Sequence, residues 1–342
     1  MDESEDLAPA TRGVVRLPAS STRVTDADEE VFLLYTNQAA RNVADGSTGF
    51  RGLGHIDSHE DTLTITFDLG TPEGMDERQG APVSATQGAR NATRRKARSK
   101  KDLPERTLEI EIMQDKTALR SRKGDTGSVV WHASVDFAQT VLRQIYKKDP
   151  ASLLLPDALK NAHLVELGAG TGLLAVALSP FTHHYTVTDI DDLVPLIRKN
   201  VARNLSRPPA SPSKQKGTLS PPNANVTTTA LDWIEMHKAA PGLKRKLAPD
   251  DPADLLLVVD CIYHPSLIPP LLSTIEYLTV PGRTAVLVVV ELRAEDVVRD
   301  FLQGWLDLSP ADEWEIWSVG GLMEGPYAVW VGWKHMLVEH AK

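Results

Sequence analysis

Cysteine is almost absent from this chain of 342 residues, in which Cys261 is the single example. One thiol excludes an intrachain disulfide and favours a reducing compartment, so we expect a cytoplasmic protein, with the nucleus as an alternative. Long apolar runs are lacking as well, because the strongest, at 285–290, is far shorter than the roughly 20 residues of a membrane helix. The acidic start, MDESEDLAPATRG, has no apolar signal region. Secreted and membrane proteins are therefore disfavoured.

An excess of basic charge is also missing. Lys and Arg together number 37 against 46 Asp and Glu, and the formal net charge is −9. This balance argues against general affinity for nucleic acid, so no specific nucleic acid and no membrane is expected as a partner. The basic run at 90–101 has two interpretations, contact with RNA or a ribosome surface and a solvated loop, and the second is simpler.

Composition divides the chain into three parts. Residues 1–30 are polar and predict a disordered leader, and residues 31–123 predict an N-terminal β-unit interrupted by a disordered basic insertion at 71–101. Two segments of that unit, 61–70 and 107–115, alternate apolar and polar residues and predict paired strands, with these residues on the buried faces: Leu63, Ile65, Phe67, Leu108, Ile110 and Ile112. The remainder, 124–342, forms the main domain and carries a Pro/Ser-rich insertion at 206–223.

The main domain alternates strand and helix signals. Nearly continuous apolar strands predict a parallel sheet that is buried on both faces, and an antiparallel pair near the end of the chain would make the sheet mixed. The expected strands lie at 163–167, 184–190, 225–231, 254–260 and 284–292, with helices at 171–179, 192–205, 265–279 and 295–306. The predicted fold is a doubly wound, mostly parallel α/β sheet.

A glycine loop, GAGTG (168–172), follows the first of these strands within the stretch VELGAGTG. Its spacing is GxGxG, whereas the dinucleotide fingerprint is GxGxxG, so a nicotinamide dehydrogenase is disfavoured. Glu166 precedes the loop, and a carboxylate there suits a cationic or zwitterionic ligand better than a diphosphate. Asp189 ends the next strand, where a carboxylate can hold two ribose hydroxyls.

These motifs resemble those of a known family. VELGAGTG with VTDI resembles class I S-adenosylmethionine-dependent methyltransferases, and LDW (231–233) with DCIYH (260–264) resembles the seven-β-strand protein-lysine methyltransferases and their D-x-x-Y motif. GDTGSVVWHASVDFA (124–138) is similar to that family's tryptophan block. LGHIDSHEDTLTI and QDKTALRSRKGDTG are most similar to its fungal ribosomal lysine methyltransferase 5 group. The resemblance covers about Val31 to Lys334 outside the two insertions and implies a Rossmann-like, seven-stranded fold.

The resemblance also implies the cofactor, S-adenosyl-L-methionine, and the residues that contact it. The glycine loop would line the methionine part, Asp189 would hold the ribose, and an indole would contact the adenine. The implied cofactor-binding residues are Trp131, Gly168, Ala169, Gly170, Asp189, Trp233 and Val259.

Each of these positions also has a purely structural interpretation. The two tryptophans could be packing residues, and Val259 alone is an ordinary core residue. Asp232 could accept from the adenine amino group or cap the helix that begins WIEMHKA. Cys261 is interpreted as buried filler rather than as a nucleophile.

The D-x-x-Y residues are the catalytic candidates, Asp260 and Tyr263. A lysine amine, with a pKa of about 10.4, must be neutral to attack a methyl group. A carboxylate orients the ammonium but favours its charged form, so Asp260 is expected to dock the amine first and to act as a base only secondarily. Tyr263 would orient the amine or wall its channel; alternatively Asp260 caps a turn and Tyr263 packs. The histidines show no metal-ligand spacing, and no metal is expected.

The sequence thus predicts a protein-lysine N-methyltransferase. The fungal resemblance implies monomethylation of a lysine in a 60S ribosomal protein of the L1 family. The alternatives are methylation of another protein or a small molecule, and a cofactor-binding assembly module without turnover.

Overall fold

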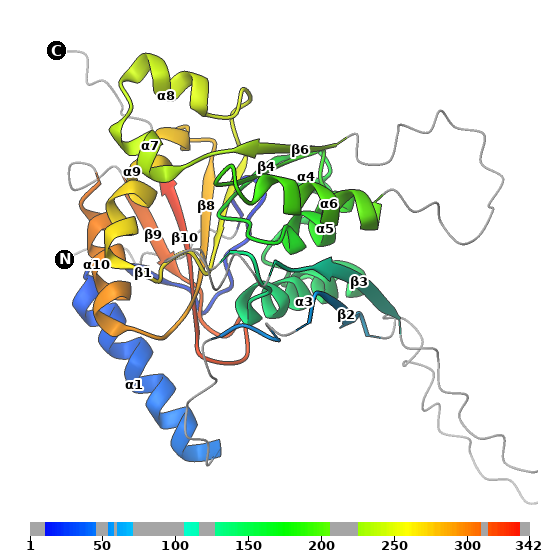
Figure 1. Ribbon diagram of the computed structural model, residues 1–342. Coiled ribbons are helices and arrows are strands. Elements are labelled where there is room, and N and C mark those ends of the chain that lie inside the picture. The colour runs from blue at the N-terminus through cyan, green and yellow to red at the C-terminus, as the bar shows by residue number, and fades with distance from the viewer. Residues whose placement is uncertain are drawn as a thin grey trace, which may run out of the picture.

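Figure 1 shows the computed structural model, which describes residues 11–45, 54–57, 60–70, 106–115, 127–205, 225–308 and 314–335. Both predicted insertions, at 71–101 and 206–223, lie outside the described residues, so their disorder stays a prediction. The basic run at 90–101 lies outside them too.

One large sheet organises the described part of the chain. Five neighbouring strands are parallel, and the last two strands in sequence form an antiparallel pair beside them. The spatial order is β6 (Val226–Ala230), β5 (His184–Asp189), β4 (His163–Leu167), β7 (Leu255–Val259), β8 (Ala285–Glu291), β10 (Tyr327–Lys334), β9 (Trp314–Ser318) and β1 (Thr22–Val24). The chain order reverses between β4 and β7, which confirms the doubly wound, mostly parallel sheet.

The eighth strand, β1, comes from the predicted leader, and that prediction is wrong for residues 11–30. Val14, Val15 and Leu17 are buried, and the main chain bonds to distant segments, as in Leu155 N–H to the Val14 carbonyl at 2.9 Å. Asp26 accepts from the Glu29 N–H at 2.9 Å and caps α1 (Ala27–Asp45). This segment is ordered by a few buried apolar residues and by backbone hydrogen bonds to distant segments. Such hydrogen bonds leave no periodic pattern in the sequence.

Helices cover both faces of the sheet (Figure 1), and the parallel strands supply side chains to both. Along β7, Leu255, Leu257 and Val259 join one core, and Leu256 and Val258 join the other. The first core packs against α3 (His132–Lys147), α4 (Pro156–Leu159), α5 (Leu173–Leu178), η1 (Ser179–Phe181) and α6 (Val194–Leu205). The second packs against α1, α7 (Trp233–Lys238), α8 (Pro241–Leu247), α9 (Ile268–Leu278) and α10 (Glu295–Leu306). Burial on both faces explains why these strands are apolar throughout.

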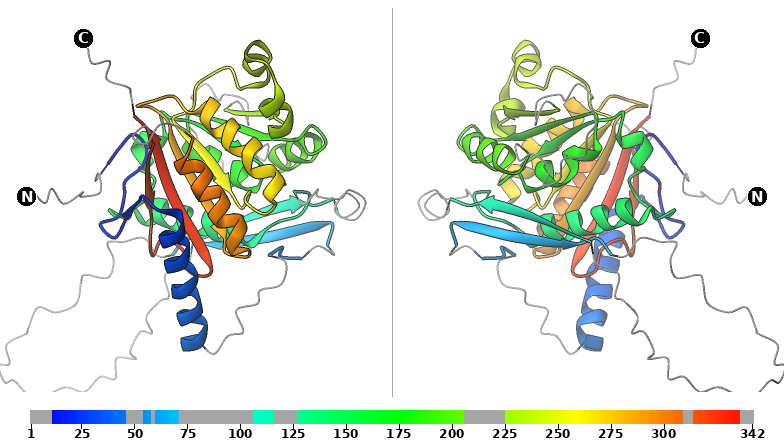
Figure 2. Two further views of the ribbon diagram at one scale, coloured as in Figure 1. Left: turned by 90° about the vertical axis from the view of Figure 1, so that its left-hand side faces the viewer. Right: turned by 90° about the vertical axis from the view of Figure 1, so that its right-hand side faces the viewer.

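The N-terminal strands β2 (Thr62–Asp68) and β3 (Thr107–Met113) pair antiparallel, as predicted. Ile65, Phe67, Ile110 and Ile112 are buried in the same core as α3 and α6. Helix α1, which the sequence analysis did not predict, packs on α10 and extends beyond the sheet (Figure 2). The residues assigned to a separate unit at 31–123 therefore share their cores with the main domain.

The closing strands β9 and β10 contribute tryptophans to the core. Trp330 and Trp333 are fully buried and Trp314 is nearly so. Within the described residues, no helix combines the length and apolar character that crossing a bilayer requires.

Candidate functional site

The glycine loop joins β4 to α5 in a conformation that only glycine adopts readily. Gly168, Gly170 and Gly172 have φ angles of +66°, +58° and +77°. A Cβ on Gly170 would lie 2.8 Å from the Gly127 carbonyl oxygen, so the segment before α3 approaches the loop closely. The loop backbone is left facing the space above the carboxyl ends of β4 and β5.

Asp189 closes this loop from the end of β5. One carboxylate oxygen accepts from the Gly170 N–H at 2.7 Å, and the other accepts from the Ile190 N–H at 2.7 Å. Asp189 is therefore fixed in position on the cavity side of the loop.

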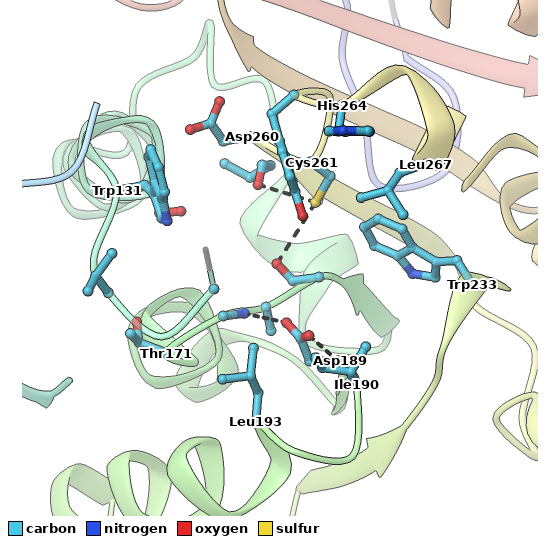
Figure 3. Close-up of a pocket in the computed structure, with 18 of the residues that line it drawn as sticks. Trp131, Thr171, Asp189, Ile190, Leu193, Trp233, Asp260, Cys261, His264 and Leu267 are labelled. Atoms are coloured by element: carbon cyan, nitrogen blue, oxygen red, sulfur yellow. Dashed lines mark hydrogen bonds between the residues drawn. The ribbon is translucent and has the colours of Figure 1, made fainter. Parts of the chain in front are cut away.

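A cavity of about 910 Å³ lies at this edge of the sheet, a size that accommodates a small molecule or cofactor. Its wall includes all nine predicted site residues: Trp131, Gly168, Ala169, Gly170, Asp189, Trp233, Val259, Asp260 and Tyr263. Figure 3 shows Trp131 and Trp233 on opposite walls, with Asp260 on a third side and Asp189 facing it across the space. The carboxyl ends of four parallel strands and the segment before α3 therefore bring these positions together, as the sequence predicted.

The two tryptophans hold different positions. Trp131 precedes α3, and its ring packs edge-on against His55, with ring centroids 6.1 Å apart. Trp233 begins α7, and a Cβ on Gly168 would come within 2.9 Å of its ring. The Trp233 indole N–H is buried and has no hydrogen-bond partner within the described residues.

The alternatives for Asp232 and Cys261 are now resolved in part. Asp232 accepts from the Ile234 N–H at 2.7 Å and from the Glu235 N–H at 3.4 Å, so it caps α7. The Cys261 thiol is buried and donates to the Leu167 carbonyl at 3.2 Å. Burial raises the pKa of Cys261, so the thiol stays protonated and acts as packing beneath the loop.

Glu166 does not contribute as the sequence suggested. Its side chain is not on the cavity wall; the residue is 3% exposed and accepts a hydrogen bond from the Tyr185 hydroxyl at 2.8 Å. Burial raises the pKa of Glu166 to about 8. The interpretation of Glu166 as a charge facing a cationic ligand is therefore wrong, because a buried carboxyl avoids ionisation and this one points into the core.

Asp260 follows β7 in an unusual backbone conformation, with φ at +58°. Its side chain is only 3% exposed and forms a two-bond ion pair with Arg293, at 2.9 Å and 2.7 Å. The Glu291 N–H also donates to Asp260, at 3.3 Å. Three of the carboxylate's acceptor positions are thus occupied, so Asp260 is less free to dock an amine than the sequence alone suggested.

Tyr263 and His264 complete the rim on this side. Tyr263 is exposed and lines the cavity, which agrees with a channel wall. His264 also lines the cavity, and its Nδ1 lies 2.8 Å from the Ser266 hydroxyl. Its outer ring nitrogen therefore carries the proton when the ring is neutral and Nδ1 accepts from Ser266.

Sequence reasoning missed Arg293 and His55, which also line the cavity. A signal for Arg293 was present, because the strand at 285–291 ends in Glu291 and is followed by Arg293. Parallel neighbours end at one edge, so charged residues after β8 fall beside those after β7. His55 gave no such signal, since it pairs with Trp131 through an isolated bridge.

The strand order, the glycine loop and the acidic residue at the end of β5 define a class I, Rossmann-like methyltransferase fold. The chain belongs to the lysine methyltransferase family, whose model matches residues 112–304. This confirms the family resemblance noted in the sequence.

Several curated relatives match parts of the chain. Ribosomal lysine N-methyltransferase 5 of Eremothecium gossypii is 31% identical over 155 residues, covering 41% of this chain and 48% of that protein. EEF1A lysine methyltransferase 3 of Xenopus tropicalis is 30% identical over 144 residues, covering 42% and 53%. A diaminohydroxyphosphoribosylamino-pyrimidine deaminase of Schizosaccharomyces pombe is 29% identical over 197 residues, covering 57% and 41%. The chain thus spans about half the length of these relatives.

Solved structures show only distant similarity. The S-adenosylmethionine-dependent methyltransferase SibL in its apo form has a TM-score of 0.35 and 17% identity, covering 53% of this chain and 52% of that chain. The fold assignment rests on the strand order and not on this low score.

Proposed function

We propose that this protein is an S-adenosyl-L-methionine-dependent protein-lysine N-methyltransferase. The observation that carries the proposal is the meeting of nine predicted residues on one cavity wall, in a chain of the lysine methyltransferase family. These residues come from the ends of four strands and from the start of α3. The spacing of the glycines, the acidic residue Asp189 and the two indoles all suit a nucleoside with a short charged tail.

The residues present fit that donor. The loop leaves no room for a side chain at Gly168, because a Cβ there would lie 2.7 Å from the Cys261 sulfur, so bare backbone borders the cavity. Asp189 holds the loop through the Gly170 N–H and lines the cavity, and we assign it to the ribose hydroxyls. Bound S-adenosyl-L-methionine supplies an electrophilic methyl group on a sulfonium. We assign the glycine loop and Val259 to the methionine and adjacent parts, and the two indoles to the nucleoside.

The chain's own contribution to transfer is chiefly alignment. Methyl transfer is an in-line displacement, which is accelerated when nucleophile and carbon are held roughly 3–3.5 Å apart. We assign Asp260 and Tyr263 to orienting the lysine amine. A carboxylate alone favours the ammonium form, so loss of the proton relies on desolvation and on the positive charge of the donor.

For the substrate, we propose a lysine of a 60S ribosomal protein of the L1 family, carried to the monomethyl state in the cytoplasm. The similarity to ribosomal lysine N-methyltransferase 5 of Eremothecium gossypii supports this choice, together with the motifs around residues 53–65 and 114–127. The similarity to EEF1A lysine methyltransferase 3 makes elongation factor 1A the alternative protein substrate.

The test uses the full chain, isotopically labelled methyl donor, and extract from cells that lack the gene. We expect one labelled band among large-subunit ribosomal proteins, and mass spectrometry should place one methyl group on a lysine. A labelled band at the position of elongation factor 1A would instead identify that protein as the substrate. Donor binding measured by calorimetry without transfer to any extract would instead favour a non-catalytic assembly module.

A further inference from the structure

Arg293 lies where β7 and β8 end side by side. The two strands are parallel, with Val259 opposite Val289, so the residues that follow them meet at the cavity edge. Asp260 is the first residue after β7, and Arg293 is the second after β8. Their contact therefore follows from the strand register and is not a chance surface pairing.

Two carboxylates share this single guanidinium. Arg293 binds Asp260 through both of its terminal nitrogens and binds Glu291 at 2.6 Å. The carboxylate side chains are 3% and 5% exposed, and Arg293 is 28% exposed. Burial disfavours the charged form of Arg293, but hydrogen bonds and charge from Asp260 outweigh it, and the pKa of Arg293 is raised. The cluster carries one net negative charge, which a substrate ammonium can balance.

Removal of the guanidinium would leave two shielded carboxyls of like charge side by side. Such a pair resists full ionisation and retains a proton to higher pH. A protonated Asp260 no longer attracts an ammonium. Arg293 therefore determines the charge state in which Asp260 faces the cavity.

The same guanidinium also contacts Trp131. It lies over the indole ring, 5.1 Å from the centroid. Gly54 also approaches the guanidinium closely, because a Cβ on Gly54 would come within 2.3 Å of it. Gly54 is joined to α3 by the His132 N–H, which donates to its carbonyl at 2.9 Å. One side chain thus connects the D-x-x-Y loop with the segment that carries Trp131.

We propose that Arg293 is a positioning residue for methyl transfer: it keeps Asp260 ionised and correctly aimed, and it fixes Trp131 beside it. This inference rests on the proposed function. It predicts that loss of the guanidinium impairs capture of the amine more than binding of the donor.

The test compares R293Q, R293K and the control R283Q. Arg283 pairs with Asp254 at 2.8 Å at the opposite ends of the same two strands, away from the cavity. Labelled-donor kinetics on the ribosomal substrate should show kcat/KM reduced roughly ten- to hundredfold in R293Q. The donor Kd from calorimetry should change less than tenfold. R283Q should match the wild type in both.

A readout that does not need turnover is the pH dependence of thermal unfolding. In R293Q the carboxyl pair keeps a proton in the folded state well above the roughly pH 4 at which unfolded carboxyls ionise. Stability from that proton is present at low pH and is lost as pH rises, so the Tm gap to the wild type should widen from about pH 4 to 8. In R283Q the guanidinium is lost from a single carboxyl, Asp254, which is more exposed. The difference in Tm between R283Q and the wild type should therefore be constant above about pH 5.

The other titratable groups around Arg293 and Asp260 are the same in every variant: His55, Asp189, Asp232, Cys261, Tyr263, His264 and Glu291. R293K keeps the charge and loses the planar fork. It should restore the pH dependence while kcat/KM stays several-fold low. If R293Q does not fold, the test of the proposal is the activity of R293K. Full wild-type activity in R293K would overturn the proposal.

Wild-type kcat/KM in R293Q, or a Tm gap that does not change with pH, would also overturn it. Failure of the wild type to methylate any protein would refute the proposed function instead. The comparison of Tm values would still test whether Arg293 keeps Asp260 ionised.

Discussion

The side-chain amide of Asn200 pairs with both main-chain polar groups of Met113. Its oxygen accepts from the Met113 N–H at 2.8 Å, and its nitrogen donates to the Met113 carbonyl at 3.0 Å and to the Thr171 carbonyl at 2.9 Å. Asn204, one helical turn later, makes the same pair with Glu111. Helix α6 thereby occupies the free edge of β3 as a neighbouring strand would, and it ties the N-terminal hairpin to the glycine loop.

We expect Asn200→Ala to lower the free energy of unfolding by about 3 kcal/mol. Asn200 is fully buried, and its loss leaves several main-chain groups unpaired at roughly 1 kcal/mol or more each. Urea denaturation measures the change. Asn204→Ala is the matched control and should cost less, since its bonds are partly exposed. Equal costs would contradict the bridging role of Asn200.

Gly170→Ala should weaken donor binding at least tenfold. The substitution requires a φ of +58° and brings a Cβ within 2.8 Å of the Gly127 carbonyl oxygen. The loop or the segment before α3 must then shift. Calorimetry with the donor measures the loss. Gly242→Ala, where a Cβ meets nothing within 4 Å, is the control and should bind normally.

Asp189→Ala and Asp260→Ala should separate donor binding from transfer. Asp189 anchors the loop through the Gly170 N–H and lines the cavity, so its loss should abolish measurable donor binding. Asp260→Ala should bind the donor within a few-fold of the wild type and suppress transfer by roughly a hundredfold. Calorimetry and labelled-donor assays measure the two effects. Normal methylation by both variants would refute the site assignment.

Glu166→Gln should flatten the pH dependence of stability. The pKa of Glu166 is raised by burial to about 8, above the roughly 4.3 of an unfolded glutamate. The wild type is therefore stabilised below about pH 4.5 and loses that stability as pH rises to about 8. Glutamine can still accept a hydrogen bond from Tyr185 and never ionises. The free energy of unfolding of the variant should therefore rise relative to that of the wild type by a few kcal/mol across that pH range. Urea denaturation at pH 5 and pH 8 tests this, and an unchanged difference between the two proteins would contradict it.

The sheet and the loop could be predicted from the sequence because both depend on local patterns. The strand at 163–167 was predicted with the bounds that β4 has, since a run buried on both faces is apolar at every position. The positions of Asp189 and Asp260 followed as well, because parallel strands place their carboxyl ends at one edge.

Other features depend on contacts between distant residues and had no local signal. Residues 11–30 are ordered by backbone bonds to segments such as 153–155, and the ionisation of Glu166 depends on burial that only packing creates. By itself, the sequence determined the alternation of strands and helices in the parallel part of the sheet and the nine candidate residues that line the cavity. Only the tertiary structure decided that Asp260 meets Arg293 and that Glu166 turns inward, because side-chain pairing across neighbouring strands depends on register and burial.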